Sequence, residues 1–309
     1  MSSTEPSTGI LLVGGASERF GSPKALAHLR GETLAERGWR LLHEACDEVL
    51  AVGKDADGLG LRLPVLDDGA AERAPVFGLI AGLRAASNDV CIALPVDCPL
   101  VTPDALRALV GAGAVSQTGP LPGAYWKAHL SELESRVARG ELSLRGVNPT
   151  VLEVDEKLLL NVNTPMDLLA AAIADWAESR DDVRAVVVVG SYARRAAPAD
   201  RWSDLDVLLF VDTPRRLTEE ASWVEEFGRP VLTFLEPTAI GGRVERRVLY
   251  EGGEDVDFVP LEPADLRELL DVPGAATLLA RGYLVLHDEL GVSEALAGVE
   301  PVPPTGPPH

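Results

Sequence analysis

The chain has 309 residues, of which 46% are hydrophobic and 25% are charged, a composition that is typical of soluble globular proteins with room for two domains. Its formal net charge of −20 argues against DNA or RNA as a partner, because such a field repels polyanions. No apolar run approaches the ~18 residues of a membrane span, so we expect no membrane partner. The polar N-terminus and the three scattered cysteines predict neither a signal peptide nor a disulfide framework, and they favour a cytoplasmic location.

The first part of the chain alternates short apolar runs with helical patterns. This alternation predicts a mostly parallel sheet covered on both faces, and hence a three-layer α/β/α Rossmann-like domain over residues 1–178. Thr164 and Pro165 have the residue types of a helix start, and we expect the helix that follows them to close this domain. The expected strands lie at 10–13, 48–53, 90–96 and 151–155, and the expected helices at about 33–44, 76–86, 103–110 and 165–176.

A charged segment without apolar periodicity, at 178–182, is the expected domain boundary. The second part is richer in strand patterns, which predicts a smaller α+β domain with a mixed sheet over residues 182–292. Residues 293–309 are rich in proline and predict an extended tail. The expected strands of this part lie at 183–189, 204–212, 230–235, 244–250 and 256–261, with a helix near 218–227.

A glycine-rich run follows the first expected strand. It reads Gly14-Gly15-Ala16-Ser17-Glu18-Arg19-Phe20-Gly21-Ser22-Pro23-Lys24, and its glycines permit a tight turn that brings backbone N–H groups against phosphate oxygens. Arg19 and Lys24 are placed to neutralise a triphosphate and its departing pyrophosphate. Asp97 lies at the carboxyl end of the 90–96 strand, where a carboxylate can hold Mg²⁺.

These motifs, together with Val96-Asp97-Cys98-Pro99 and Asn161-Val162-Asn163-Thr164-Pro165, resemble the molybdenum cofactor guanylyltransferase family over about residues 9–172. That family belongs to the sugar-nucleotide-type NTP transferases. The resemblance implies that a phosphate of molybdopterin attacks the α-phosphorus of GTP and releases pyrophosphate. It also implies contact with a molybdoenzyme or its chaperone. One departure is Ala74-Pro75, where the family usually has Gly-Pro.

The resemblance also implies roles for individual residues. Asp97 would hold the metal, and Asn163 would lie near the metal or the substrate. Arg19 and Lys24 would contact the phosphates as catalytic residues. The expected nucleotide-binding residues are Leu12, Gly14, Gly15, Ser17, Arg19, Lys24, Asp67, Asp97 and Asn163.

A second constellation begins at Gly190-Ser191, where an expected strand ends, and continues with Asp204-Leu205-Asp206, which opens the next. Residues two apart in a strand point to one face, so Asp204 and Asp206 can bind the same ions. A third carboxylate should come from a neighbouring strand. Asp257 is the candidate, with Asp255 on the same face as the fallback. Three carboxylates with two Mg²⁺ ions form the two-metal arrangement for nucleotidyl transfer.

This part resembles the polymerase-β-type nucleotidyltransferase fold, and within it the aminoglycoside 6-adenylyltransferases, over about residues 183–290. The resemblance implies catalytic and metal-binding roles for Asp204, Asp206 and Asp257, and nucleotide contacts for Gly190 and Ser191. It implies ATP as the nucleotide, with an unidentified acceptor. Tyr192 and Ala199 stand where the family often has cations, and from the pattern of the 309 residues we expect no counterpart of the helical domain that follows in the family.

Two functional hypotheses therefore stay open. In the first, a fusion enzyme carries out molybdenum cofactor guanylylation in its first domain and adenylyl transfer in its second. In the alternative, the first domain transfers a nucleotide to another phosphorylated small molecule, and the second is a non-catalytic module that senses nucleotide. The acceptors, the oligomeric state and any coupling between the two sites lie beyond these patterns.

Overall fold

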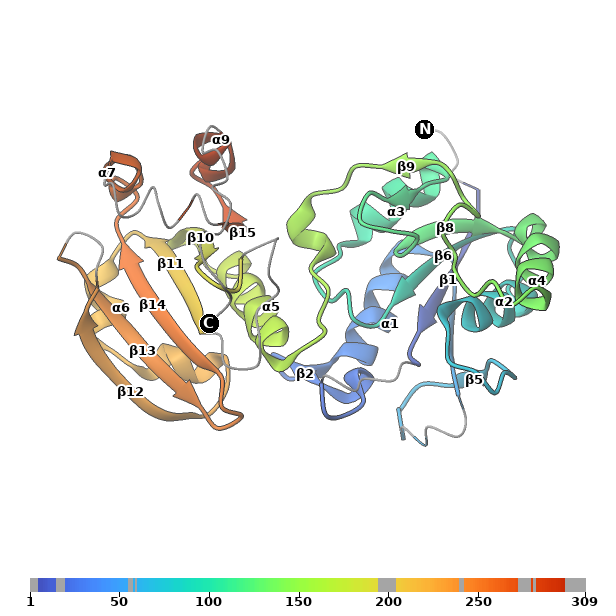
Figure 1. Cartoon of the computed structure of the whole chain (residues 1–309), viewed down its shortest axis with the longest axis horizontal. Coiled ribbons are helices and arrows are strands. Elements are labelled where there is room, and N and C mark those ends of the chain that lie inside the picture. Colours follow the sequence, from blue (N-terminus) through green and yellow to red (C-terminus); the bar gives the residue numbers. More distant parts are fainter. Residues whose placement is uncertain are drawn as a thin grey trace. The chain divides into compact units, whose positions relative to one another are not determined.

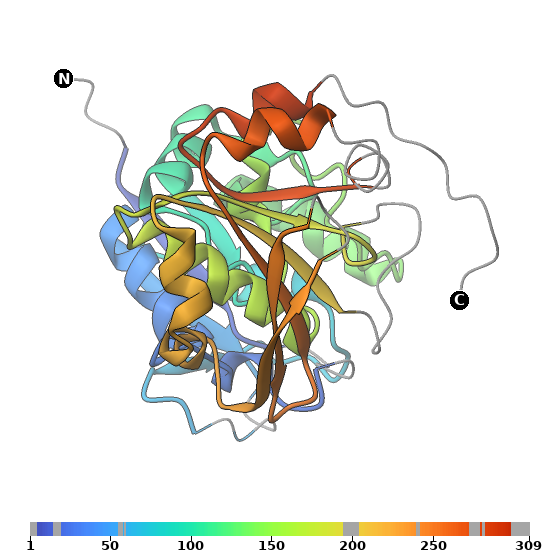
Figure 2. The same cartoon turned by 90° about the vertical axis from the view of Figure 1, so that its left-hand side faces the viewer.

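Figures 1 and 2 show the computed structural model of the chain, which describes residues 5–14, 20–54, 58, 60–193, 204–238, 242–271, 279 and 282–297. The chain divides into two compact units, Met1–Asp167 and Leu168–His309. Both units combine sheets with helices, as the sequence predicts. None of the described helices is long and apolar enough to cross a membrane.

The first unit is built on a seven-stranded sheet. Its central strands are parallel, whereas β8 runs antiparallel to both β6 and β7. The sequence patterns missed β8, which is only four residues long. In spatial order the strands are β5 (Val65–Asp67), β4 (Glu48–Gly53), β1 (Ser7–Leu12), β6 (Val90–Pro95), β8 (Gly123–Trp126), β7 (Val115–Ser116) and β9 (Val151–Leu152). A separate ribbon pairs β2 (His28–Leu29) with β3 (Glu32–Thr33).

Helices cover both faces of this sheet. Successive side chains of β1 point to opposite faces, so Ile10 and Leu11 are buried on different sides. An added Cβ at Gly38 of α1 would lie 2.6 Å from Leu11, and one at Gly82 of α2 would lie 2.6 Å from Ile10. The two glycines therefore let the helices approach β1 closely from opposite sides. The helices are α1 (Leu34–Ala45), α2 (Pro75–Ala85), α3 (Pro103–Ala112) and α4 (Leu130–Ala138), with 3-10 turns η1 (Lys24–Leu26), η3 (Lys127–His129) and η4 (Glu156–Leu159).

The second unit is built on a six-stranded mixed sheet in which β11 and β14 are parallel neighbours and the other pairs are antiparallel. The helix expected near 218–227 is instead two short turns, α6 and η5. The strands, in spatial order, are β12 (Pro230–Pro237), β13 (Val244–Tyr250), β14 (Asp255–Leu261), β11 (Leu205–Val211), β10 (Val183–Val189) and β15 (Leu284–Asp288). The described helical segments are α5 (Pro165–Glu178), α6 (Pro214–Glu219), η5 (Ser222–Glu226), α7 (Asp265–Asp271) and α9 (Val292–Leu296).

The position of α5 differs from the sequence-based expectation, which placed this helix in the first domain and the boundary at 178–182. The structure divides the chain at Asp167/Leu168, so most of α5 belongs to the second unit. The reason is aromatic packing: Trp176 stacks on Trp223 with ring centroids 5.9 Å apart and meets Phe227 edge-on at 5.4 Å. The expected tail also starts too early, because α9 continues to Leu296.

We therefore predict that Trp176→Ala destabilises the second unit. Trp176 is fully buried, and truncation of a buried tryptophan costs about 3–5 kcal/mol. The matched control is Trp39→Ala, which removes a half-buried tryptophan of α1 in the first unit. Urea unfolding followed by far-UV circular dichroism should show a transition that moves to lower urea in Trp176→Ala only. Equal shifts in the two variants would contradict the assignment of α5.

Candidate active sites

The first candidate site lies where the strand order of the first sheet reverses. The chain passes from β1 to β4 on one side and later returns to β6 on the other, which leaves a crevice beyond the carboxyl ends of β1 and β6. A cavity of about 300 Å³ opens there, and Leu12 and Gly14 line it. The described lining also includes three basic residues (Lys24, Lys54 and Arg73) and two carboxylates (Asp68 and Asp97).

Lys24 joins the three motifs of the first unit. Its Nζ donates to Asp97 Oδ2 at 3.0 Å and to Asn163 Oδ1 at 2.8 Å, although the three residues are far apart in the sequence. The Lys24 and Asp97 side chains are both largely shielded from solvent. The structure therefore brings together Lys24, Asp97 and Asn163.

The segment that carries Asn163 is held rigidly beside Asp97. The N–H of Val162 donates to the Asp97 carbonyl at 2.8 Å, and Asp167 Oδ2 accepts from the N–H groups of Asn163 and Thr164, both at 2.8 Å. The Asn161 amide, in the orientation that satisfies both of its polar atoms, donates to Asp97 Oδ1 at 2.9 Å. Asn161 is a positioning residue that the sequence reasoning did not single out.

Carboxylate and amide oxygens are the ligands that Mg²⁺ prefers, and Asp97 and Asn163 present one of each to a shared cation, the ammonium of Lys24. This donor set fits a divalent ion. Three of the other expected nucleotide-binding residues cannot be placed. Gly15, Ser17 and Arg19 lie outside the described residues.

Asp67 is exposed and its Oδ1 accepts from the N–H of Gly69 at 2.7 Å, whereas its neighbour Asp68 lines the cavity. Asp68 forms an ion pair with Lys54 at 2.8 Å, and both side chains are at most 10% exposed. The sequence reasoning missed this pair. The available signal was the position of Lys54, directly after the strand 48–53.

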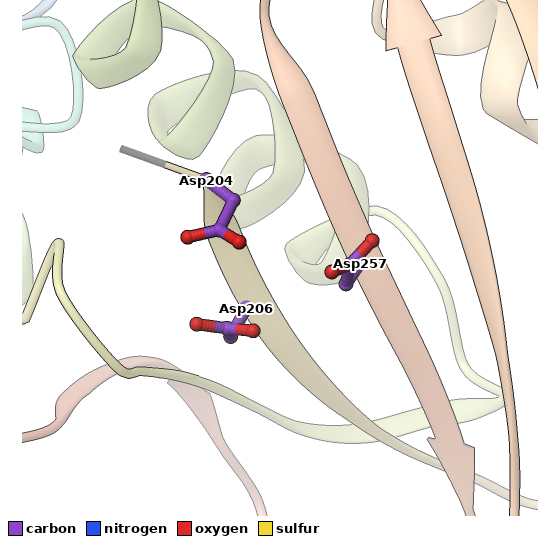
Figure 3. Close-up of side chains that lie close together, drawn as sticks. All are labelled: Asp204, Asp206 and Asp257. Atoms are coloured by element: carbon purple, nitrogen blue, oxygen red, sulfur yellow. The ribbon is translucent and has the colours of Figure 1, made fainter. Parts of the chain in front are cut away.

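The second candidate site is a cluster of three carboxylates in the second unit. Asp204 and Asp206 lie at the start of β11, and Asp206 is the cross-strand neighbour of Asp257 on the parallel strand β14. One oxygen from each carboxylate lies within 4.8 Å of the others. Figure 3 shows Asp204 and Asp206 along the start of β11, beside Asp257 on the neighbouring strand β14. The fallback residue, Asp255, is instead bound by Arg247 at 3.2 and 2.8 Å.

Asp257 is the most shielded member of the cluster. Burial raises the pKa of its carboxyl to about 7, against the opposing effect of the Arg247 guanidinium and with the help of Glu245 and the neighbouring aspartates. Arg247 Nη1 lies 3.5 Å from Asp257 Oδ2. Oδ1 is buried and has no hydrogen-bond partner among the described residues. An orphaned carboxylate oxygen beside two other carboxylates fits a divalent cation.

Gly190 and Ser191 follow β10 beside this cluster. Gly190 has φ +75°, a left-handed conformation, and a Cβ added there would collide with Asp206 Oδ2. Ser191 Oγ is buried without a hydrogen-bond partner among the described residues. Sequence reasoning missed two neighbours on β13, Arg247 and Glu245, because that strand carries no motif.

The shifted pKa of Asp257 predicts pH-dependent metal binding. A carboxyl with a pKa of about 7 must lose its proton before it can bind a cation, so protons compete with the metal below neutral pH. We expect Mn²⁺ to bind this site about tenfold more tightly at pH 8 than at pH 6. Isothermal titration of the Asp97→Asn variant, in which the first site is disabled, measures the affinity. An unchanged affinity over this range would contradict the assignment.

Comparison with known proteins covers both units. The family model described as "MobA-like NTP transferase domain" matches residues 9–127. The protein named "Probable molybdenum cofactor guanylyltransferase" from Aquifex aeolicus is 30% identical over 173 residues, which cover 51% of this chain and 86% of the relative. Its namesake from Chloroflexus aggregans is 33% identical over 191 residues, which cover 52% of this chain and 91% of the relative. The chain belongs to the molybdenum cofactor guanylyltransferase family. This confirms the resemblance of the first unit and makes the protein a nucleotidyltransferase.

This member of the guanylyltransferase family carries a second match. The model described as "Streptomycin adenylyltransferase" covers residues 166–285, so it includes α5. The crystal structure of an aminoglycoside 6-adenyltransferase from Bacillus subtilis aligns with 35% of this chain and 38% of that chain, at 16% identity and a TM-score of 0.27. The sequence match agrees with the resemblance expected for the second part.

Proposed function

We propose that the first unit transfers GMP from GTP to molybdopterin and releases pyrophosphate, with Mg²⁺ as the metal. The observation that carries this proposal is the Lys24–Asp97–Asn163 network, because it stands at the crevice of a unit that matches guanylyltransferases over nearly their whole length. In the transfer, a phosphate oxygen of molybdopterin forms a bond to the α-phosphorus of GTP. The bond between that phosphorus and the bridging oxygen of pyrophosphate breaks.

The residues of the crevice have distinct tasks in this reaction. Asp97 and Asn163 would hold Mg²⁺, which when bound neutralises phosphate charge. Lys24, at the start of the 3-10 turn η1, supplies a cation next to both oxygens and would contact the triphosphate. Asn161 keeps the Asp97 carboxylate in one orientation. The described lining of the cavity holds three basic residues against two carboxylates, and this positive balance favours an anionic ligand.

The test is a panel of nucleoside triphosphates. The full chain is incubated with Mg²⁺ and GTP, ATP, CTP or UTP, with and without molybdopterin, and pyrophosphate release is followed. We expect turnover with GTP that depends on molybdopterin. Turnover with a different phosphorylated acceptor but not with molybdopterin would show that the unit is a nucleotidyltransferase and that the acceptor in the proposal is wrong. If none of the four nucleotides supported turnover, the proposal would be overturned.

We also propose that the second unit transfers AMP from ATP to an acceptor that is still unidentified. The support is the cluster of Asp204, Asp206 and Asp257. In addition, the buried atoms Asp257 Oδ1 and Ser191 Oγ each have no hydrogen-bond partner among the described residues. These carboxylates would hold the divalent cations that polarise the triphosphate. Binding of ATP without transfer to any aminoglycoside or protein acceptor would favour a module that senses nucleotide.

A further inference from the structure

Arg247 lies beside the carboxylate cluster of the second unit. It is the cross-strand neighbour of Asp257 on β14, and Asp257 is in turn the cross-strand neighbour of Asp206 on β11. Because residues that are directly opposite each other in neighbouring strands share a face of the sheet, the three side chains form one row. Arg247 Nη1 lies 3.5 Å from Asp257 Oδ2. The guanidinium is therefore next to the oxygens that are expected to hold metal ions.

Asp255 fixes the orientation of this guanidinium. Arg247 Nε donates to Asp255 Oδ1 at 3.2 Å and Nη2 donates to Oδ2 at 2.8 Å, so a bidentate pair uses two of the three guanidinium nitrogens. The third nitrogen, Nη1, makes no hydrogen bond with a described residue. Its contacts there are the longer ion pairs with Asp257 Oδ2, at 3.5 Å, and Glu236 Oε1, at 3.7 Å. A third of the side chain is exposed, so a ligand can reach it.

The composition of the second unit leaves arginine as its permanent cation. Residues 168–309 contain no lysine. The charge of a triphosphate bound in this unit must therefore be balanced by metal ions, backbone N–H groups or arginine. A guanidinium that a carboxylate holds in place suits this task, because its planar group presents N–H donors to phosphate oxygens in a fixed geometry.

We propose that Arg247 binds the triphosphate of the nucleotide at the second site, with Nη1 donating to a phosphate oxygen while Asp255 keeps the guanidinium in place. This inference rests on the nucleotidyl transfer proposed for the unit. The carboxylate cluster would hold metal ions that bind the phosphates, and Arg247 lies one strand further along the same face. Its positive charge offsets the negative charge that departing pyrophosphate carries away.

Calorimetric titration with α,β-methylene-ATP, an analogue that cannot transfer AMP, tests the proposal. The titration uses the Asp97→Asn background and saturating Mg²⁺, so that a change in metal affinity does not affect the result. The binding that Asp206→Asn removes belongs to the second site. We expect Arg247→Gln to weaken this binding by about tenfold or more, because a hydrogen bond between charged groups is lost. The affinity for adenosine, measured by competition, should stay within about twofold, since adenosine has no phosphate.

Arg184→Gln is the matched control. Arg184 forms the same kind of bidentate pair, with Asp212 at 2.9 and 2.8 Å, but its Nη1 already donates to Glu289 at 3.1 Å. It is the second residue of β10, whereas the cluster lies beside the last residue, Val189, which is paired with Asp206. The control removes the same charge from the same sheet and should leave analogue binding within about twofold. A loss equal to that of Arg247→Gln would overturn the proposal.

The test separates failure of this inference from failure of the proposed transfer. If Asp206→Asn left analogue binding unchanged, no nucleotide would bind at the second site and the transfer of AMP would be wrong. If Asp206→Asn removed the binding and Arg247→Gln did not weaken it, the site would stand and Arg247 would have no part in it. Circular dichroism checks folding. If Arg247→Gln does not fold, Arg247→Lys replaces it: it keeps the charge, loses the planar group and should weaken binding severalfold, and unchanged binding would overturn the proposal.

Discussion

Asp97→Asn is expected to lower guanylyl transfer to molybdopterin by about 10³-fold, which is about 4 kcal/mol of lost transition-state stabilisation. Asparagine keeps the size of the side chain, and its amide oxygen can still accept from Lys24. It loses the negative charge that would hold Mg²⁺ between Asp97 and Asn163. The loss therefore falls on turnover rather than on folding. Initial rates of dinucleotide formation at saturating GTP measure it.

The matched control for this prediction is Asp104→Asn. Asp104 is an exposed residue in the first turn of α3 and pairs only locally, with Arg107. The same loss of one charge there should leave the rate within about twofold, since exposed ion pairs contribute little. If Asp97→Asn kept a rate within about twofold of wild type, as the control should, Asp97 would have no role in holding the metal.

Gly190→Ala is expected to weaken Mn²⁺ binding at the second site by about 10- to 100-fold, the usual cost of disturbing the support of a metal ligand. The new Cβ would collide with Asp206 Oδ2 and push that carboxylate away from Asp204 and Asp257. The left-handed backbone adds about 1–2 kcal/mol of strain. Calorimetric titration in the Asp97→Asn background isolates this site.

Gly291→Ala separates the collision from the strain. Gly291 has φ +72°, close to that of Gly190, but an added Cβ there would meet nothing within 4 Å. This control should lose similar stability and keep wild-type Mn²⁺ affinity. Equal losses of affinity in the two variants would mean that backbone strain, and not the position of Asp206, determines metal binding.

The strands that form the two sites could be predicted closely from the sequence. Buried strands such as 48–53 and 183–189 are mostly apolar runs, interrupted only near their starts by Glu48 and Arg184, and their observed bounds match the predicted ones. The α/β architecture of the first unit and the mixed sheet of the α+β second unit follow from the same patterns. A four-residue strand such as β8 carries too few residues to show a period, so it was missed.

The unit to which α5 belongs could not be predicted in the same way. The residue types of Thr164 and Pro165 indicate where this helix starts. The packing of Trp176 determines which unit the helix belongs to. Trp223 and Phe227 lie about fifty residues further along the chain, and periodicity does not reveal such partners.

The candidate sites show the same difference: residues with a local sequence pattern could be predicted, and residues that depend on distant contacts could not. Alternation in a strand narrowed the third carboxylate to Asp257 or Asp255, which share a face, and the structure places the Asp257 carboxylate with those of Asp204 and Asp206. Arg247 and Asn161 escaped notice because their importance comes from the carboxylates that they bind. Asp67 and Asp68 are adjacent, and only the path of the loop shows which one lines the cavity.

In the proposed function, guanylyl transfer takes place in the first unit and is independent of the carboxylates of the second. The most direct test is mass-spectrometric detection of the molybdopterin–GMP product in wild type, Asp97→Asn and Asp206→Asn, each supplied with GTP, Mg²⁺ and molybdopterin. We expect product in wild type and in Asp206→Asn at equal rates, and almost none in Asp97→Asn. Product that survives in Asp97→Asn and disappears in Asp206→Asn would contradict it.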